Sequence, residues 1–130
     1  MEPARPSGLT VLLADDSPEL RTMLTDWLRR AGHTVIGAAS GGEAAAVLRR
    51  THVDVVITDV VMPGGDGIEL IRDFRVSRPK LRFVAISGGG QGVGTLDCLA
   101  LARDAGADCC LLKPFTPPEL LAALWPKAPA

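Results

Sequence analysis

The chain has 130 residues, 47% of them hydrophobic, and a formal net charge of −1 at pH 7. This length suits one domain with a buried core rather than two, and the nearly neutral charge provides no general attraction for nucleic acid or for an anionic membrane. No apolar run in the sequence approaches membrane-spanning length, and residues 1–8 lack the apolar core of a signal peptide. We therefore expect a cytoplasmic domain that neither inserts into a membrane nor binds nucleic acid directly.

Five apolar strands alternate with five amphipathic helices along the chain. The first strand covers 9–14, and the helix after it covers 18–31, with Ser17 as N-cap and Pro18 in the first helical position. Capping-box patterns at Ser40 and Thr116 begin the second helix, which ends near residue 50, and the last helix, which ends at residue 125. The other predicted strands cover 34–39, 53–58, 81–87 and 108–112, and the other predicted helices cover 68–76 and 95–105.

This alternation predicts the fold class. Strands that are apolar nearly throughout need helices on both faces of a parallel sheet. We therefore predict an α/β domain of the flavodoxin-like, doubly wound type, in which a five-stranded parallel sheet, (βα)5, forms the middle of three layers, α/β/α. The domain should span 9–125, with tails at 1–8 and 126–130.

Five polar residues stand at the ends of four predicted strands. Asp15 and Asp16 follow the first strand, Asp59 the third, Ser87 the fourth and Lys113 the fifth. Because the connections of a parallel sheet are right-handed, these residues should meet at the carboxyl edge of the sheet, where such folds bind ligands. Turn formation alone does not require so many polar groups at one edge.

Three neighbouring carboxylates repel one another, and a divalent cation removes this conflict. Two carboxylates about 6 Å apart repel by roughly 3 kcal/mol at an effective dielectric of about 20. A set of oxygen ligands with open positions suits Mg²⁺. Zinc is not expected, because His33 and His52 lie at the far ends of their strands and the three cysteines lack metal-binding spacing.

The same residues match the needs of phosphoryl transfer. A carboxylate can act as nucleophile and form an aspartyl-phosphate, and the reaction then needs correct positioning and neutralisation of the phosphoryl oxygens. Mg²⁺ can neutralise one oxygen, the Lys113 ammonium another, and the Ser87 hydroxyl can bond the third.

At these residues the chain resembles the receiver domain of two-component response regulators, from about residue 9 to residue 124. Each motif is weak alone, but all of them occur in order at the ends of the expected strands. The motifs are L-L-A-D-D-S with the acidic pair, I-T-D-V-V-M-P-G-G-D-G with Asp59, A-I-S-G with Ser87, and L-L-K-P-F with Lys113.

The resemblance implies specific roles in metal binding. Asp59 is the implied phosphoacceptor, and Asp16, Asp59 and the backbone carbonyl of Val61 are the implied direct ligands of Mg²⁺. Asp15 is implied to act through a metal-bound water.

The resemblance also assigns the remaining site residues. Lys113 is implied to pair with the phosphoryl group, Ser87 to move in and bond it as a switch residue, and the Lys113–Pro114 peptide to be cis. Pro114 is thus the implied cis-proline, and the fold's catalytic group consists of Asp59, Ser87 and Lys113.

Three features depart from the family pattern. Cys110 occupies the switch position three residues before the lysine, where the family usually carries Tyr or Phe, so a large rotating ring is not expected. The interval between Ser87 and Lys113 is longer than usual, and its glycine-rich part, 88–94, is expected to order upon phosphorylation. Val61 is apolar where many relatives are polar, which predicts a long-lived phosphoryl group.

The favoured function is a phosphoacceptor domain of a phosphorelay, a signalling module rather than an enzyme. A histidine kinase or a histidine phosphotransfer protein would supply the phosphoryl group to Asp59. An unidentified downstream protein would then bind the face formed by the fourth helix, fifth strand and fifth helix, and the domain itself would be a monomer or a weak homodimer.

Two alternatives belong to other classes. A small Mg²⁺-dependent aspartyl-phosphate phosphatase or phosphotransferase of the haloacid-dehalogenase type needs a second Asp two residues after the nucleophile, where this chain has Val61, and a cap for which it has no spare length. A scaffold that works without phosphorylation does not need the complete set of five polar residues.

Overall fold

A computed structural model of the chain describes residues 8–60, 62, 67–88 and 95–125, with the side chains of 95–99 outside this description. The predicted tails, apart from Gly8, also lie outside it. The strands are β1 (Thr10–Ala14), β2 (Thr34–Ala38), β3 (Val55–Asp59), β4 (Arg82–Ser87) and β5 (Cys109–Leu112). The helices are α1 (Pro18–Arg30), α2 (Gly41–Arg50), α3 (Gly67–Arg75), α4 (Thr95–Ala105) and α5 (Pro117–Ala122).

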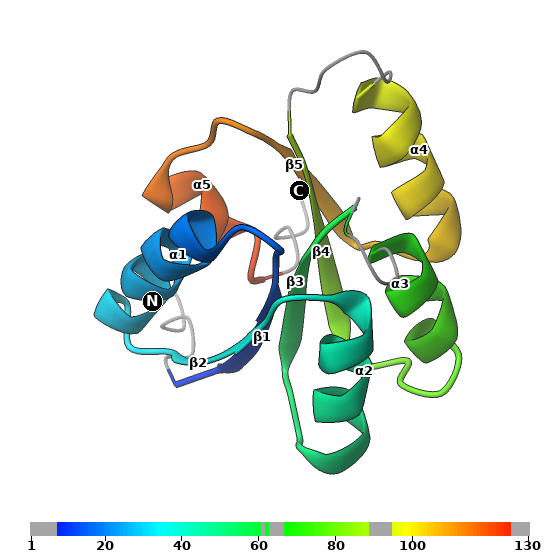
Figure 1. Cartoon of the computed structure of the whole chain (residues 1–130), viewed down its shortest axis with the longest axis horizontal. Helices are drawn as coiled ribbons and strands as arrows, with labels where there is room; N and C mark the ends of the chain where they lie inside the picture. Colours follow the sequence, from blue (N-terminus) through cyan, green and yellow to red (C-terminus); the bar gives the residue numbers. More distant parts are fainter. Residues whose placement is uncertain (1–7, 61, 63–66, 89–94, 126–130) are drawn as a thin grey trace, which may run out of the picture.

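The strands form one parallel sheet in the order β2-β1-β3-β4-β5. Helices α1 and α5 cover one face of the sheet, and α2, α3 and α4 cover the other (Figure 1). The predicted doubly wound, three-layer fold is therefore confirmed. The strand order changes direction between β1 and β3, and folds of this type form their ligand sites at the carboxyl edge beside such a change.

Alternating side chains of each strand fill two cores, one on each face of the sheet. In β1, Val11 packs with the core under α1 and α5, and Leu12 packs with the core under α2, α3 and α4. Cys109 and Cys110 of β5 contact opposite cores in the same way. Because both faces are covered, the strands are apolar except near their ends, as the sequence pattern indicates.

Helix ends agree with the local capping signals at most positions. Ser17 caps α1 by accepting a hydrogen bond from the Leu20 N–H, and Thr116 and Glu119 form the predicted capping box of α5. Helix α5, however, ends at Ala122 rather than at residue 125. Because a proline follows Trp125, that residue is disfavoured in helical conformation and the helix ends before it.

None of the helices within the described ranges has the length and apolar character that a membrane crossing requires.

Candidate functional site

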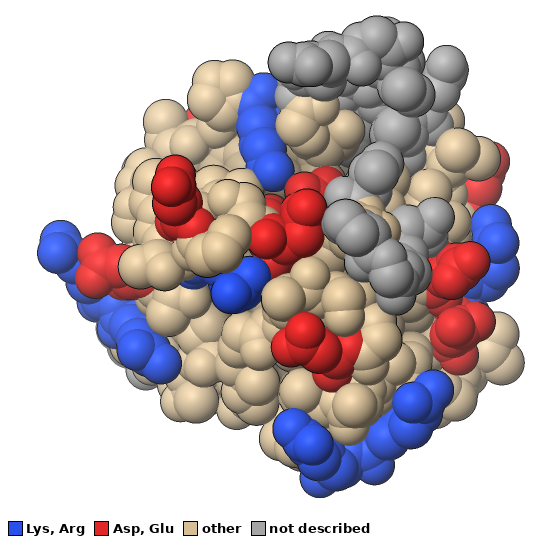
Figure 2. All heavy atoms as spheres, viewed as in Figure 1, with Lys and Arg blue, Asp and Glu red and all other residues tan. Residues whose placement is uncertain are grey.

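The register between β1 and β3 brings three carboxylates together. Ala14 pairs with Thr58, so the residues that follow them, Asp15 and Asp59, reach the same level of the sheet edge. Each of Asp15, Asp16 and Asp59 offers a carboxylate oxygen, and these three oxygens lie within 4.8 Å of one another. Asp15 is buried, Asp59 is half-buried and Asp16 is exposed, and acidic atoms are visible near the centre of the face in Figure 2, over the carboxyl ends of the strands.

The register between β4 and β5 adds a hydroxyl and an ammonium group to the same edge. Ser87 pairs with Leu112, and the next residue, Lys113, donates its backbone N–H to the Ser87 carbonyl at 2.9 Å. Ser87 is buried, whereas the Lys113 side chain is one-quarter exposed. The Lys113–Pro114 peptide bond is cis.

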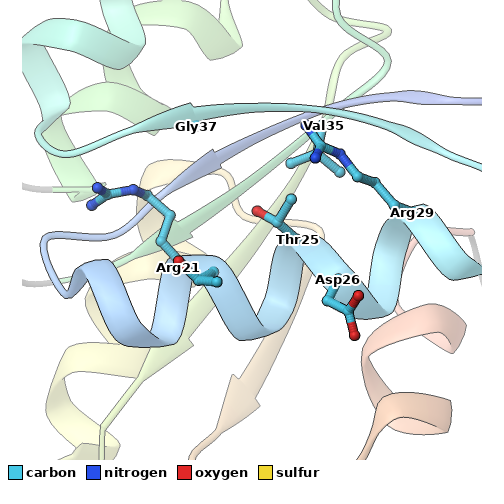
Figure 3. A pocket seen from close by; sticks show the side chains of 7 residues that line it. Arg21, Thr25, Asp26, Arg29, Val35 and Gly37 are labelled. Carbon is cyan, nitrogen blue, oxygen red and sulfur yellow. The ribbon is translucent and has the colours of Figure 1, made fainter.

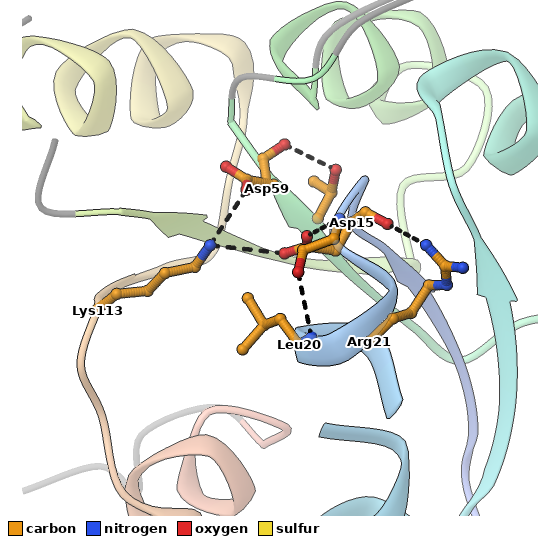
Figure 4. Close-up of polar contacts among 7 residues, drawn as sticks. Asp15, Leu20, Arg21, Asp59 and Lys113 are labelled. Atoms are coloured by element: carbon orange, nitrogen blue, oxygen red, sulfur yellow. Dashed lines mark hydrogen bonds and ion pairs between the residues drawn. The ribbon is translucent and has the colours of Figure 1, made fainter. Parts of the chain in front are cut away.

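Lys113 neutralises part of the acidic cluster. Its Nζ atom lies 3.2 Å from Oδ2 of Asp59 and 3.6 Å from Oδ2 of Asp15, so one ammonium group bridges two carboxylates (Figure 4). One positive charge against three negative charges leaves the cluster acidic. At a separation of 4.8 Å, two carboxylates repel by roughly 3 kcal/mol at an effective dielectric of about 20, and by less where one of them is exposed.

The donor set fits a hard divalent cation. Asp15 is only 1% exposed, and among the described atoms its Oδ2 accepts no hydrogen bond, while its Oδ1 accepts one from the Ser17 N–H at 2.8 Å. A buried carboxylate oxygen without a hydrogen bond is costly unless a cation compensates it. Oxygen ligands from Asp15, Asp16 and Asp59 with exposure on one side suit Mg²⁺, which retains several waters.

Gly67 lies very close to the carbonyl of Asp59, a contact that sequence reasoning missed. A Cβ atom on Gly67 would stand 2.0 Å from the Asp59 carbonyl oxygen and 2.9 Å from Oγ1 of Thr58. The Gly67 N–H donates to the Val60 carbonyl at 3.0 Å, so the first residue of α3 packs directly against the end of β3. In the sequence, Gly67 stands directly before the helix predicted at 68–76, and its contact with Asp59 could not be foreseen because it depends on how the chain returns to the sheet.

Arg21 is a second neighbour of the site that the sequence analysis did not single out. Its Nη1 atom donates to the Asp15 carbonyl oxygen at 2.7 Å. In Figure 4, Arg21 and Lys113 approach Asp15 from opposite sides. The six-residue separation between Asp15 and Arg21 is compatible with this contact, but many other arginines occupy such positions without one.

The Cys110 thiol takes the position next to the site where the family pattern has an aromatic ring. Its residue pairs with Ala85 of β4 and packs against the core under α4. Burial raises the pKa of the Cys110 thiol, and the Arg103 guanidinium beside it acts in the opposite direction. The thiol is therefore a small neutral group at neutral pH.

Two groups of residues singled out in the sequence lie outside the described residues. They are Val61, with its proposed carbonyl ligand and its effect on the phosphoryl lifetime, and most of the glycine-rich segment, residues 89–94.

Comparison with known proteins identifies the family. The family model of the response regulator receiver domain matches residues 11–125. The chain is 32% identical to the chemotaxis protein CheY of Thermotoga maritima over 118 residues, which cover 90% of this chain and 95% of that protein. It is also 36% identical to the transcriptional regulatory protein TcrA of Mycobacterium tuberculosis over 123 residues. This alignment covers 92% of this chain but only 46% of TcrA.

Solved structures give the same result. A putative response regulator from Chloroflexus aurantiacus superimposes with a TM-score of 0.81 and 32% sequence identity, over 91% of this chain and 98% of that chain. With its fold, its acidic edge and its sequence matched over nearly the whole length, the chain belongs to the response regulator receiver domains, the signalling modules of two-component systems.

Proposed function

We propose that Asp59 accepts a phosphoryl group from a phosphohistidine and that the phosphorylated domain signals to a second protein. The observation that carries the proposal is the arrangement around Asp59. Its half-buried carboxylate lies within 4.8 Å of two further aspartate oxygens and 3.2 Å from the Lys113 ammonium. A partly exposed carboxylate flanked by cation sites is suited to attack a phosphorus atom and to hold the product.

In the proposed reaction an Asp59 carboxylate oxygen attacks the phosphorus of the donor's phosphohistidine. A P–O bond forms as the P–N bond breaks, and the imidazole leaves with the electron pair of the broken bond and takes a proton. Lys113 already contacts Asp59 and Asp15, and it would turn from these carboxylates to a phosphoryl oxygen. The Ser87 hydroxyl, at the end of the adjacent strand, would donate a hydrogen bond to another phosphoryl oxygen.

Asp16, Asp59 and the carbonyl of Val61 would hold Mg²⁺ directly, and Asp15 would act through a metal-bound water. When bound, Mg²⁺ would neutralise the charge that phosphoryl transfer places on the oxygens. The Oδ2 atom of Asp15 supports this role, because it is buried, accepts no hydrogen bond among the described residues and is balanced by the Lys113 ammonium at a distance of 3.6 Å.

The phosphoryl donor is a histidine kinase or a histidine phosphotransfer protein, and both act in the cytoplasm in this proposal. Receiver domains as a family interact with kinases and downstream effectors, and the proposed effector face here is formed by α4, β5 and α5. Leu101 on α4 and Leu112 on β5 support this location, because half of each apolar side chain is exposed (50% and 46%). Among the described residues, β5 is also the edge strand on this side of the sheet.

Switching through this face would differ from the aromatic pattern of the family. Cys110 has no aromatic ring that could move toward the site upon phosphorylation. We therefore propose that Ser87 and the segment 88–94 carry most of the conformational response. A beryllofluoride phosphoryl mimic should slow amide exchange in this segment. Large changes elsewhere without any in 88–94 would contradict this part of the proposal.

Phosphorylation of purified protein tests the central claim. The wild type and Asp59→Asn are incubated with a small phosphodonor in Mg²⁺, and the added mass is measured on intact protein. The matched control is Asp73→Asn, an exposed carboxylate on α3. We expect one phosphoryl group on the wild type and the control and none on Asp59→Asn. Equal labelling of Asp59→Asn would refute the assignment, and no labelling of any protein would favour a scaffold that works without phosphorylation.

A further inference from the structure

We propose that Arg21 is a positioning residue for the acidic site, holding the peptide between Asp15 and Asp16 so that both carboxylates face one cation. This inference rests on the proposed Mg²⁺-dependent function. The contact itself is a charge-assisted hydrogen bond from Arg21 Nη1 to the Asp15 carbonyl oxygen at 2.7 Å, a type that is shorter and stronger than bonds between neutral groups.

The bonded carbonyl belongs to the peptide that carries Asp16. Asp16 is exposed, so packing does not fix its carboxylate, and the direction of that side chain follows the direction of the backbone. The neighbouring backbone has two further bonds, from the Asp15 N–H to the Ala38 carbonyl at 3.0 Å and from the Ser17 N–H to Asp15 Oδ1 at 2.8 Å. Arg21 restrains the peptide that lies between these two bonds.

Contacts other than this hydrogen bond also restrain Arg21. Its backbone N–H donates to the Ser17 carbonyl at 2.9 Å, within the capped first turn of α1. Its side chain lines one end of the hollow between α1 and β2, beside Gly37 (Figure 3). A Cβ atom at Gly37 would lie 3.6 Å from Arg21 Cδ, so the arginine stem passes β2 at the one position of that strand that has no side chain. A side chain confined between a helix and a strand loses less conformational entropy when it forms its bond than a freely exposed one.

Arg21 and Lys113 bind different groups of Asp15 and therefore have different roles. Lys113 lies against the carboxylates of Asp15 and Asp59, whereas Arg21 binds a backbone carbonyl on the opposite side of Asp15 (Figure 4). Arg21 therefore occupies no carboxylate oxygen of the cluster and does not compete with a cation for a ligand.

Positioning and simple charge predict opposite effects of removing Arg21. If Arg21 acts only as a nearby positive charge, its loss increases the negative potential at the cluster and tightens Mg²⁺ binding. If it positions the ligands, its loss weakens Mg²⁺ binding, as loss of outer partners of metal ligands does by about 10–100-fold.

The test measures Mg²⁺ affinity calorimetrically for the wild type, Arg21→Met, Arg21→Lys and Arg29→Met. Methionine keeps much of the stem without the charge or the donor, and lysine keeps the charge. Arg29 is the matched control because it is exposed on the same helix and lines the other end of the same hollow (Figure 3). We expect Arg21→Met to bind Mg²⁺ about tenfold more weakly, Arg21→Lys to lie between it and the wild type, and Arg29→Met to match the wild type. Unchanged or tighter binding by Arg21→Met overturns the proposal.

A metal-free measurement separates this inference from the proposed function. In chelator, the amides of Asp15 and Ser17 should exchange hydrogen faster in Arg21→Met than in the wild type and Arg29→Met, because the peptide between them is released. Melting curves verify that every variant is folded. Equal exchange in all three proteins overturns the inference. Failure of the wild type to bind Mg²⁺ would instead count against the proposed function, and the exchange rates would then decide the role of Arg21 alone.

Discussion

At the scale of single residues, Gly67 is a position beside the site that has no room for a side chain. Its Cα faces the Asp59 carbonyl so closely that an added Cβ would stand 2.0 Å from the oxygen. The contact is with backbone, which cannot rotate away as a flexible side chain would. The end of β3 and the start of α3 must therefore separate if this glycine is replaced.

Gly67→Ala is expected to lower the free energy of unfolding by about 2 kcal/mol, the middle of the range for forced overpacking, and to slow phosphorylation of Asp59 by displacing its backbone. Urea unfolding measures the first effect and mass labelling the second. Gly37→Ala is the control, since its Cβ would meet nothing closer than 3.6 Å. Similar stability of the two variants would show that α3 shifts without cost.

His33 is another single residue with a measurable consequence, because it accepts a hydrogen bond through a ring nitrogen. The side chain is 5% exposed, and its Nδ1 accepts from the Leu9 N–H at 3.2 Å. Burial lowers the pKa of His33 below its usual 6.5. The folded protein thus takes up this proton at lower pH than the unfolded chain does.

This difference sets the sign of a pH effect. The contribution of His33 to stability is complete above pH 6.5 and is lost as the pH falls from there through the lowered pKa of the folded state. His33→Asn keeps an acceptor for the Leu9 N–H but does not titrate. We expect the unfolding free energy of the wild type to fall more steeply than that of His33→Asn between pH 7 and pH 5. Parallel curves in urea titrations would exclude His33 as the cause.

At the scale of elements, one carboxylate joins α3, β4 and β5 at the amino-terminal edge of the sheet. Asp108 Oδ2 accepts from Arg75 Nη2 at 2.6 Å and from the Phe83 N–H at 2.8 Å. The Arg75 guanidinium also lies over the Phe83 ring, 4.8 Å from its centroid. Gly106, with φ of 120°, leaves room for the Arg75 stem, since a Cβ there would stand 2.8 Å from Arg75 Cγ.

Asp108→Ala should lower the unfolding free energy by about 1–3 kcal/mol, because it leaves the Phe83 N–H and the Arg75 guanidinium without this acceptor. The control is Asp104→Ala, an exposed position on α4, where we expect a change within about 0.5 kcal/mol. Chemical denaturation of both variants provides the measurement. Equal losses would mean that water replaces the carboxylate at little cost.

At the scale of the whole molecule, the fold gathers negative charge at one edge of the sheet. The net charge of the chain is nevertheless only −1. Exposed cations are placed elsewhere, for example Arg49 and Arg50 in the last turn of α2. The three carboxylates within 4.8 Å of one another oppose folding, because the single Lys113 ammonium balances only part of their charge. The proposed Mg²⁺ binding would therefore be linked to stability.

Mg²⁺ at ten times its dissociation constant should stabilise the wild type by about 1.4 kcal/mol and raise its melting temperature by roughly 5 °C. Asp16→Asn should lose this shift and, in chelator, should melt no lower than the wild type, because the lost carboxylate is exposed and only adds repulsion. Differential scanning calorimetry with and without Mg²⁺ decides. If Mg²⁺ does not change the melting temperature of the wild type, the proposed link between Mg²⁺ binding and stability is wrong.

The sequence by itself determined the elements, their order and the edge at which the polar residues gather. Hydrophobic periodicity and caps such as Ser17 and Thr116 are local, since they depend on residues at most a few positions apart. The right-handed connections of parallel strands then bring every strand end to one edge. For this reason Asp15, Asp59 and Lys113 could be placed together before any distance was known.

Only the tertiary structure decided which groups touch within that edge. The bridge from Lys113 to Asp15 and Asp59 depends on register across three strands, and the bond from Arg21 to the Asp15 carbonyl depends on how α1 leans toward β2. The approach of Gly67 to Asp59 depends on the path by which the chain returns to the sheet. Such contacts arise from the packing of separate elements, and no local pattern in the sequence encodes the distance at which two elements pack.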